Sequence, residues 1–255
     1  PQFVEMIFQT RSKVKRSKSV HAKGRIGFME DKETEIQKLK EEYHLALSRI
    51  SHEIRNPVTL INSYLQLIST EHPEIKDWNH WSELMDNMTF LKQLLNDLSN
   101  YNNAKLLKYS EASPYVILES VIKSYMPAFE AQHIKVSLEK DGPIPPFMLD
   151  TVKMREVFYN ILRNATEAMP DGGNIYCTVR SDTDNIIIHI EDTGNGIAKS
   201  ELREIMDPFV THKKDGTGLG LAIVNDVVRA HKGLVTLDAD TGKGMIVTII
   251  LPIMF

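Results

Sequence analysis

A long apolar repeat in the first third of the chain constrains the fold more than any other feature. Apolar residues recur at alternating steps of three and four from Ile36 to Ile68, the spacing of one face of an amphipathic helix in near-heptad register. His52 lies two positions from the nearest apolar member on either side, so its side chain is expected about 200° away from that face. The repeat therefore predicts a helix over residues 31–68 that carries an exposed histidine.

The residues after His52 indicate chemistry on this helix. Glu53 follows it directly, and a carboxylate that holds a proton on one imidazole nitrogen leaves the other nitrogen free as a nucleophile. An ordinary surface histidine is the alternative at this point. The H-E-x-x-H zinc motif would need a histidine where Asn56 stands, which excludes a metalloprotease of that type. Pro57 falls in the helix interior and is expected to bend the helix there.

Bulk composition is that of a globular chain with an uneven charge distribution. The 255 residues are 42% hydrophobic and 25% charged, which favours about two domains. Residues 1–28 contain seven basic residues and one glutamate, or +6, so the rest of the chain carries −10 of the net charge of −4. Nucleic-acid binding by this acidic body is not expected. The single cysteine, Cys177, excludes an intrachain disulfide and lies in an apolar run that predicts burial.

The first thirty residues resemble the inner edge of a membrane segment. An apolar stretch over residues 3–8 precedes five cations, as the positive-inside rule would give, although no run of about 18 apolar residues occurs. A plain linker is the alternative. We therefore expect residues 1–30 to be a basic juxtamembrane or linker segment. The chain would then be the cytoplasmic portion of a sensor protein of the inner or plasma membrane.

A second apolar repeat predicts a helical hairpin. Apolar residues from Trp81 to Tyr101 keep steps of three and four, which predicts a helix that ends near Leu107. Two long helices joined by the break near Pro73 should be antiparallel, yet a pair alone cannot bury both apolar stripes. We expect residues 31–108 to form a homodimeric four-helix bundle, with packing onto the second domain as the alternative.

The remaining residues, 112–255, are predicted to form an α+β domain. Residues 113 and 114, Ser-Pro, are typical of an N-cap followed by a first-turn proline. Strands are expected at 135–138, 174–180, 186–191, 234–238 and 245–251, and helices at 114–125, 151–168 and 219–230.

Two groups of polar residues in this domain suit a nucleotide. Asn160 and Asn164 are one helical turn apart, and amide oxygens are suitable ligands for Mg²⁺; solvated or capping asparagines are the alternative. Asp192 ends a β-branched strand and can accept a hydrogen bond from an exocyclic amine such as that of adenine. Gly194 and Gly196 would let the backbone approach a base closely, although a tight turn explains them equally well.

A second glycine-rich segment precedes the last predicted helix. Gly216, Gly218 and Gly220 alternate with Thr217 and Leu219, so backbone amides and a helix N-terminus can contact phosphates. The segment is neither a Rossmann fingerprint nor a Walker loop. Upstream lie Thr211, Lys213 and Lys214, where a cation would meet the γ-phosphate, with solvated charges as the alternative.

Taken together, these segments resemble the bacterial sensor histidine kinases over about residues 31–255. Residues 51–57 are similar to the H box, 160–165 to the N box, 192–196 to the first glycine box, 207–211 to the F box and 216–221 to the second glycine box. The resemblance implies a dimerisation and phosphotransfer hairpin. An α/β-sandwich ATP-binding domain of the gyrase, Hsp90, histidine kinase and MutL type would follow it. The wording of residues 52–66 resembles that of the sporulation or phosphate-relay kinases of spore-forming bacteria.

The resemblance also implies roles and partners. ATP would phosphorylate His52, which Glu53 would orient and deprotonate. Asn160 and Asn164 would hold Mg²⁺, and Asp192 would bind the adenine amine. The phosphoryl group would pass to an aspartate of a response regulator in a two-component or phosphorelay pathway. A small protein that inhibits the hairpin is a further expected partner. The residues expected to contact ATP are Asn160, Asn164, Asp192, Gly194, Gly196, Thr211, Lys213, Gly216, Thr217, Gly218, Leu219 and Gly220.

Three other functions are weighed against this one. A gyrase-type or chaperone-type ATPase usually has a glutamate where Asn160 stands and does not need an exposed His-Glu pair. A non-catalytic dimeric scaffold does not need an intact set of nucleotide motifs. A phosphatase that acts on the response regulator is compatible with the kinase, since Asn56 would position water one helical turn after Glu53.

Overall fold

The computed structural model describes residues 26–213 and 216–253, with side chains described from residue 46 onward. The chain forms two compact units, residues 1–52 and residues 53–255. Residues 1–25 of the predicted basic segment, and Lys214, lie outside the described residues. The predicted division into residues 1–30, 31–108 and 112–255 stays a prediction.

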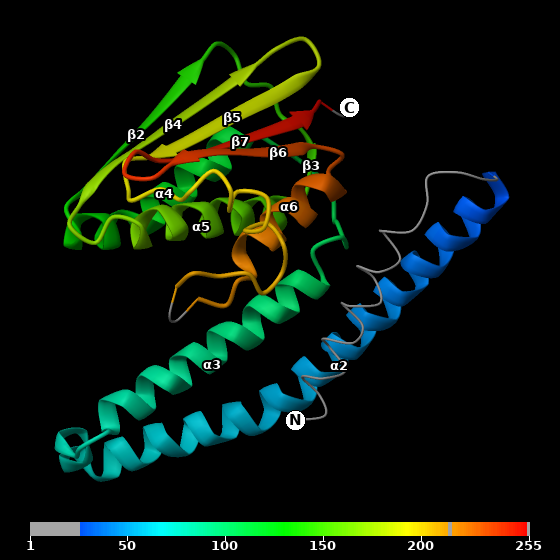
Figure 1. Cartoon of the computed structure of the whole chain (residues 1–255). Coiled ribbons are helices and arrows are strands. Elements are labelled where there is room, and N and C mark those ends of the chain that lie inside the picture. Colours follow the sequence, from blue (N-terminus) through cyan, green and yellow to red (C-terminus); the bar gives the residue numbers. More distant parts are fainter. Residues whose placement is uncertain (1–25, 214–215, 254–255) are drawn as a thin grey trace. The chain divides into compact units, whose positions relative to one another are not determined.

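The described elements follow the predicted order of helices first and a mixed domain second (Figure 1). They are α2 (Ile26–Glu71), η1 (Pro73–Asp77), α3 (Trp81–Asn102), β1 (Ser110–Ala112), α4 (Pro114–Ala131), β2 (Ile134–Asp141), β3 (Phe147–Leu149), α5 (Thr151–Glu167), β4 (Gly173–Ser181), β5 (Asn185–Asp192), α6 (Gly220–Ala230), β6 (Leu234–Asp240) and β7 (Gly244–Pro252). Among the described helices, none has an apolar stretch long enough to cross a membrane. The predicted α+β class is confirmed.

The later part of α2 packs against α3 as a helical hairpin. Val58, Met88 and Leu95 form a small buried cluster between the two helices. Arg55 adds a polar contact, because its Nη2 donates to the Leu95 carbonyl at 3.1 Å. Figure 1 shows α2 and α3 joined through η1 at one end of this hairpin. The helix continues through Pro57, so the proline does not end it.

The second hairpin helix ends earlier than its apolar repeat predicts. Asn103 is the C-cap of α3, and both its backbone N–H and its side-chain Nδ2 donate to the Ser99 carbonyl, at 3.1 and 3.0 Å. The backbone bond is the last i→i−4 bond of the helix, whereas the side-chain bond to the same carbonyl competes with helix continuation. Ala104 then turns into the core of the mixed domain, where it is fully buried. The chain therefore leaves the helix five residues before Leu107, the predicted end near residue 107 being wrong.

A five-stranded sheet forms the centre of the mixed domain, in the order β2-β4-β5-β7-β6. Strands β2 and β4 are parallel, and the other neighbours are antiparallel. Alternate residues of β4 are buried, as a half-buried strand requires: Ile175, Cys177 and Val179 face the core, and Tyr176 is exposed. Two three-residue strands, β1 and β3, pair separately and were too short for the sequence pattern to predict.

Helices α4, α5 and α6 cover one face of this sheet (Figure 1). Their apolar faces and the inward residues of the strands form one core. Helix α4 continues past its predicted end at residue 125 and contains Pro127. The continuation buries Phe129 fully and places the centre of its ring 5.3 Å from the centre of the Tyr125 ring. Ser113 occupies the predicted N-cap position, but its side chain forms no capping bond. Burial of Cys177 also raises its pKa to about 12.

Candidate functional site

A large cavity brings the predicted polar motifs of the mixed domain together. It measures about 1320 Å³ and is also lined by α3 residues between positions 80 and 93. Nine predicted site residues line it: Asn164, Asp192, Gly196, Thr211, Lys213, Gly216, Thr217, Gly218 and Gly220. Three predicted site residues do not line the cavity: Asn160, Gly194 and Leu219. Leu219 is fully buried in the core. Residues that are far apart in the sequence thus meet at one surface.

Helix α5 supplies one wall of the cavity and is firmly capped. Asp150 is its N-cap, and Oδ1 accepts from the Lys153 N–H at 2.9 Å. Oδ2 accepts from the Lys108 N–H at 2.6 Å, and the Asp150 N–H donates to His231 Nε2 at 2.9 Å. His231 is buried and donates from Nδ1 to the Val227 carbonyl at 2.8 Å, and burial lowers its pKa. The start of α5 is therefore fixed to α6 and to the segment after α3.

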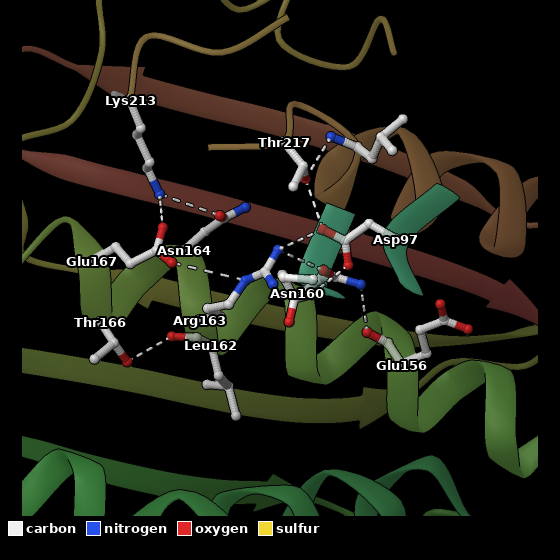
Figure 2. Close-up of polar contacts among 12 residues, drawn as sticks. Asp97, Glu156, Asn160, Leu162, Arg163, Asn164, Thr166, Glu167, Lys213 and Thr217 are labelled. Atoms are coloured by element: carbon white, nitrogen blue, oxygen red, sulfur yellow. Dashed lines mark hydrogen bonds and ion pairs between the residues drawn. The ribbon is translucent and has the colours of Figure 1, made fainter. Parts of the chain in front are cut away.

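The two asparagines of α5 present their amide oxygens to cationic groups (Figure 2). Asn160 is buried, its Nδ2 donates to the Glu156 carbonyl at 3.0 Å, and its Oδ1 accepts from Arg163 Nη2 at 3.3 Å. Asn164 Oδ1 accepts from Lys213 Nζ at 3.3 Å, and the same ammonium contacts Glu167. Both oxygens thus face positive charge, so a cation is chemically compatible with this wall.

Asp192 occupies the end of β5 as a buried carboxylate. It is 4% exposed, and Oδ1 accepts from the Gly194 N–H at 2.9 Å. Burial raises the pKa of this carboxyl, against the opposing effect of the backbone bonds from Gly194 and Met245. A side chain at position 194 would bring Cβ to 2.7 Å from the Ala168 carbonyl oxygen, so only glycine fits there. Asp192 is thus a buried acceptor at the edge of an open cavity.

The segment before α6 closes another side of the cavity. Gly218 has φ of +66°, and a Cβ there would lie 2.6 Å from the Phe209 carbonyl carbon, so this position requires glycine. The Phe209 N–H donates to the Gly218 carbonyl at 2.8 Å, which fixes the two ends of this segment to each other. Gly220 is the first residue of α6, so the partial positive charge of the helix N-terminus lies at the cavity.

Several cavity residues were missed by sequence reasoning. Ile197, Ile205, Val210 and Met245 supply an apolar portion of the lining that suits an aromatic base. The sequence did offer a signal for two of these residues: Ile197 directly follows Gly196, and Val210 lies inside the F box. No sequence signal indicated the buried Asp97 on α3, because its partner Thr217 lies 120 residues later in the chain.

The predicted histidine site lies on α2. His52, Glu53 and Asn56 are all exposed, whereas Ser51 and Val58 are buried. The exposed position predicted for His52 is therefore confirmed. The catalytic roles of these three residues stay predictions.

Comparisons with known proteins give a family model for the mixed domain and several sequence relatives. Residues 149–254 match the family model described as "Histidine kinase-, DNA gyrase B-, and HSP90-like ATPase". Sporulation kinase E of Bacillus subtilis (strain 168) is 29% identical over 205 residues, covering 80% of this chain and 28% of the relative. Sporulation kinase A of the same organism is 32% identical over 214 residues, which cover 80% of this chain and 33% of that relative. The chain therefore spans about a third of the length of these relatives.

A solved structure shows the same fold. ShkA, whose full-length crystal structure is in complex with AMPPNP, superposes with a TM-score of 0.66 at 23% identity, over 82% of this chain and 46% of that one. Residues 149–254 are thus similar to ATPase domains of the histidine kinase, gyrase B and HSP90-like class, and ShkA shares the fold. More particularly, the chain is similar to the sporulation kinases and to other bacterial sensor histidine kinases, in agreement with the resemblance found in its sequence.

Proposed function

We propose that this chain is the catalytic part of an ATP-dependent protein-histidine kinase that phosphorylates itself on His52. The observation that carries the proposal is the single cavity in which Asn164, Asp192 and the glycines before α6 meet. It joins a buried acceptor, an apolar lining and a helix N-terminus, which suit the amine, the ring and the phosphates of ATP respectively. The similarity to sporulation kinases supports the same substrate.

Within this cavity each group has a defined task. Asp192 accepts from the exocyclic amine of adenine, and the apolar residues contact the ring. The amides at the start of α6 bind phosphate oxygens, and Lys213 exchanges its contact with Glu167 for one with the γ-phosphate. Asn164 in the cavity wall, and Asn160, whose Oδ1 lies beside the lining residue Gly220, would hold Mg²⁺ through their amide oxygens, as their present cationic contacts indicate. Mg²⁺ would neutralise charge that develops on the phosphates.

On the helix α2, His52 supplies the nucleophile. The free imidazole nitrogen attacks the γ-phosphorus, the bond to the β–γ bridging oxygen breaks, and ADP leaves with the bonding electrons. Glu53 is exposed beside it and holds the proton on the other nitrogen. His52 then passes the phosphoryl group to an aspartate carboxylate of a response regulator. A phosphorelay that controls sporulation is the pathway that the relatives favour.

The proposed assembly is a homodimer. The described hairpin leaves Ile61, Leu67 and Ile68 at 49%, 50% and 37% exposure, although they are apolar. A second copy that covers this face would form the four-helix bundle that the repeats predict. An upstream membrane sensor segment and a small protein inhibitor of the hairpin are further parts of the proposal, which rest on the resemblance alone.

A second activity is proposed for Asn56. It is exposed one helical turn after Glu53, so its amide lies on nearly the same helix face. We infer that it orients water against the phosphorylated aspartate of a regulator bound over His52. The variant Asn56→Ala should therefore keep self-phosphorylation and slow removal of phosphate from the regulator. Equal loss of both activities would contradict this division.

Self-phosphorylation can be tested directly. The protein is incubated with γ-labelled ATP and Mg²⁺, and the label should be acid-labile and alkali-stable, as a phosphohistidine is. His52→Gln should abolish labelling and leave nucleotide affinity unchanged, while the control His72→Gln, which alters another exposed hairpin histidine, should label normally. Persistent labelling of His52→Gln would overturn the assignment.

A further inference from the structure

Asp97 on α3 is a buried carboxylate that contacts Thr217 and Arg163, two residues that line the cavity (Figure 2). Its Oδ1 accepts from Gln93 Nε2 at 2.6 Å, and its Oδ2 accepts from Thr217 Oγ1 at 2.7 Å. Arg163 Nη2 lies 3.6 Å from the same Oδ2. One carboxylate oxygen of α3 thus contacts both α5 and the glycine-rich segment before α6.

Arg163 has donors that its present partners do not use. Its Nη2 donates to Asn160 Oδ1 at 3.3 Å, but the carboxylates of Asp97 and Glu167 lie at ion-pair distances of 3.6 and 3.8 Å. In the described part of the chain its Nε is buried without a hydrogen-bond partner. A guanidinium carries five N–H donors in a fork that matches phosphate oxygens. Arg163 therefore retains hydrogen-bonding capacity for an anionic ligand.

The location of Arg163 matches a phosphate position. It lines the cavity together with Gly218 and Gly220. A Cβ at Gly220 would lie 3.4 Å from Arg163 Nη2, so the guanidinium is directly beside the first residue of α6. A helix N-terminus and an arginine side chain at one place both attract negative charge.

We propose that Arg163 binds the phosphates of the nucleotide and that Asp97 competes with them for it, so that α3 lowers the affinity of the cavity for ATP. This proposal rests on the proposed nucleotide-binding function and adds a phosphate-binding residue and a regulatory contact to it. The hydrogen bond between Asp97 and Thr217 also holds the glycine-rich segment against α3 while Asp97 contacts Arg163. A movement of α3 that withdraws Asp97 would release Arg163 and Thr217 together. A signal that reaches the hairpin would thereby change nucleotide affinity.

The charge of Asp97 makes the competition testable. Asp97→Asn keeps the size and an acceptor for Thr217 but removes the charge that attracts Arg163. Loss of one partly buried ion pair should tighten binding of a non-hydrolysable ATP analogue about fivefold, and adenosine binding should not change. Arg163→Gln should weaken binding of the analogue about 10-fold to 100-fold, because hydrogen bonds to a charged group are lost. Asp77→Asn, an exposed change of equal charge on η1, is the matched control.

Calorimetry on the full chain, with the two single variants and the double variant, decides between competition and simple repulsion. Competition requires that Asp97→Asn has no effect on analogue affinity in the Arg163→Gln background. Tightening that persists there would show that Asp97 only repels phosphate, and it would overturn the proposal. No tightening in Asp97→Asn would overturn it as well. If the wild-type protein binds neither adenosine nor the analogue, the proposed function itself fails and this proposal with it.

A second measurement needs no change at Asp97. In ¹⁵N-labelled wild-type protein, the Nε–H signal of Arg163, assigned by its loss in Arg163→Gln, should shift when the ATP analogue is added. Adenosine should leave it in place, because only the phosphates reach the guanidinium. Equal shifts with both ligands, or none with the analogue, would refute phosphate binding by Arg163.

Discussion

Replacement of Asp192 by asparagine tests the nucleotide site most directly. The carboxylate is 4% exposed, and burial raises its pKa above the ordinary value of 3.8. In Asp192→Asn the charged acceptor for the adenine amine becomes a neutral one. A hydrogen bond to a charged group contributes about 1.5–3 kcal/mol, so ATP and adenosine should both bind about 10-fold to 100-fold more weakly. Isothermal titration calorimetry with adenosine isolates this contact from the phosphates.

The control for this variant is Glu191→Gln. Glu191 is the preceding residue of β5, is exposed on the opposite side of the strand and carries the same charge. Its replacement should leave the affinity for adenosine within about twofold, since a solvated charge away from the cavity contributes little. Equal weakening in both variants, or unchanged affinity in Asp192→Asn, would refute the assignment of Asp192 as the adenine acceptor.

The protonation of Asp192 gives the same prediction a pH dependence. Adenine requires the ionised carboxylate, and the raised pKa places its protonation at a higher pH than that of an exposed aspartate. Wild-type affinity for adenosine should therefore fall as the pH is lowered through this pKa. Asp192→Asn should lack this fall, because it has no carboxyl to protonate. A parallel pH profile in both proteins would show that another group is responsible.

Four further outcomes are expected. Glu53→Ala should slow labelling of His52 by about 10²–10⁴-fold in a single-turnover assay, and an unchanged rate would remove Glu53 as the base. Asp150→Ala, which removes the cap of α5 and the acceptor for Lys108, should lower the free energy of unfolding by about 2–3 kcal/mol in urea titrations. Because burial lowers the pKa of His231 from 6.5, stability present above pH 6.5 should be lost as the pH falls through the lowered value, and urea midpoints would show it. Ile61→Asp should shift sedimentation toward the monomer, whereas an unchanged dimer would place the interface elsewhere.

Periodicity allowed most helices and strands to be predicted, and it failed where single residues determined an end. The five strands of the main sheet were found because each has alternating or continuous β-branched residues. The end of α3 coincides with a bond from the Asn103 side chain to the Ser99 carbonyl, which no apolar spacing reports. The continuation of α4 depends on burial of Phe129 in a core that includes residues from distant strands. Local rules favoured an earlier end at Pro127, and tertiary packing outweighed them.

The candidate site shows the same limit in its chemistry. Asn164, Asp192 and the glycines could be found from sequence because each needs a special residue type at a fixed place within one motif. Asp97 could not, since its function requires a partner 120 residues later in the chain and depends on how α3 meets α5 and α6. A buried aspartate in an otherwise apolar helix face is costly unless it is paired. That cost is offset here by Gln93, Thr217 and Arg163 together, so a residue that the sequence patterns did not indicate connects α3 to two residues that line the cavity.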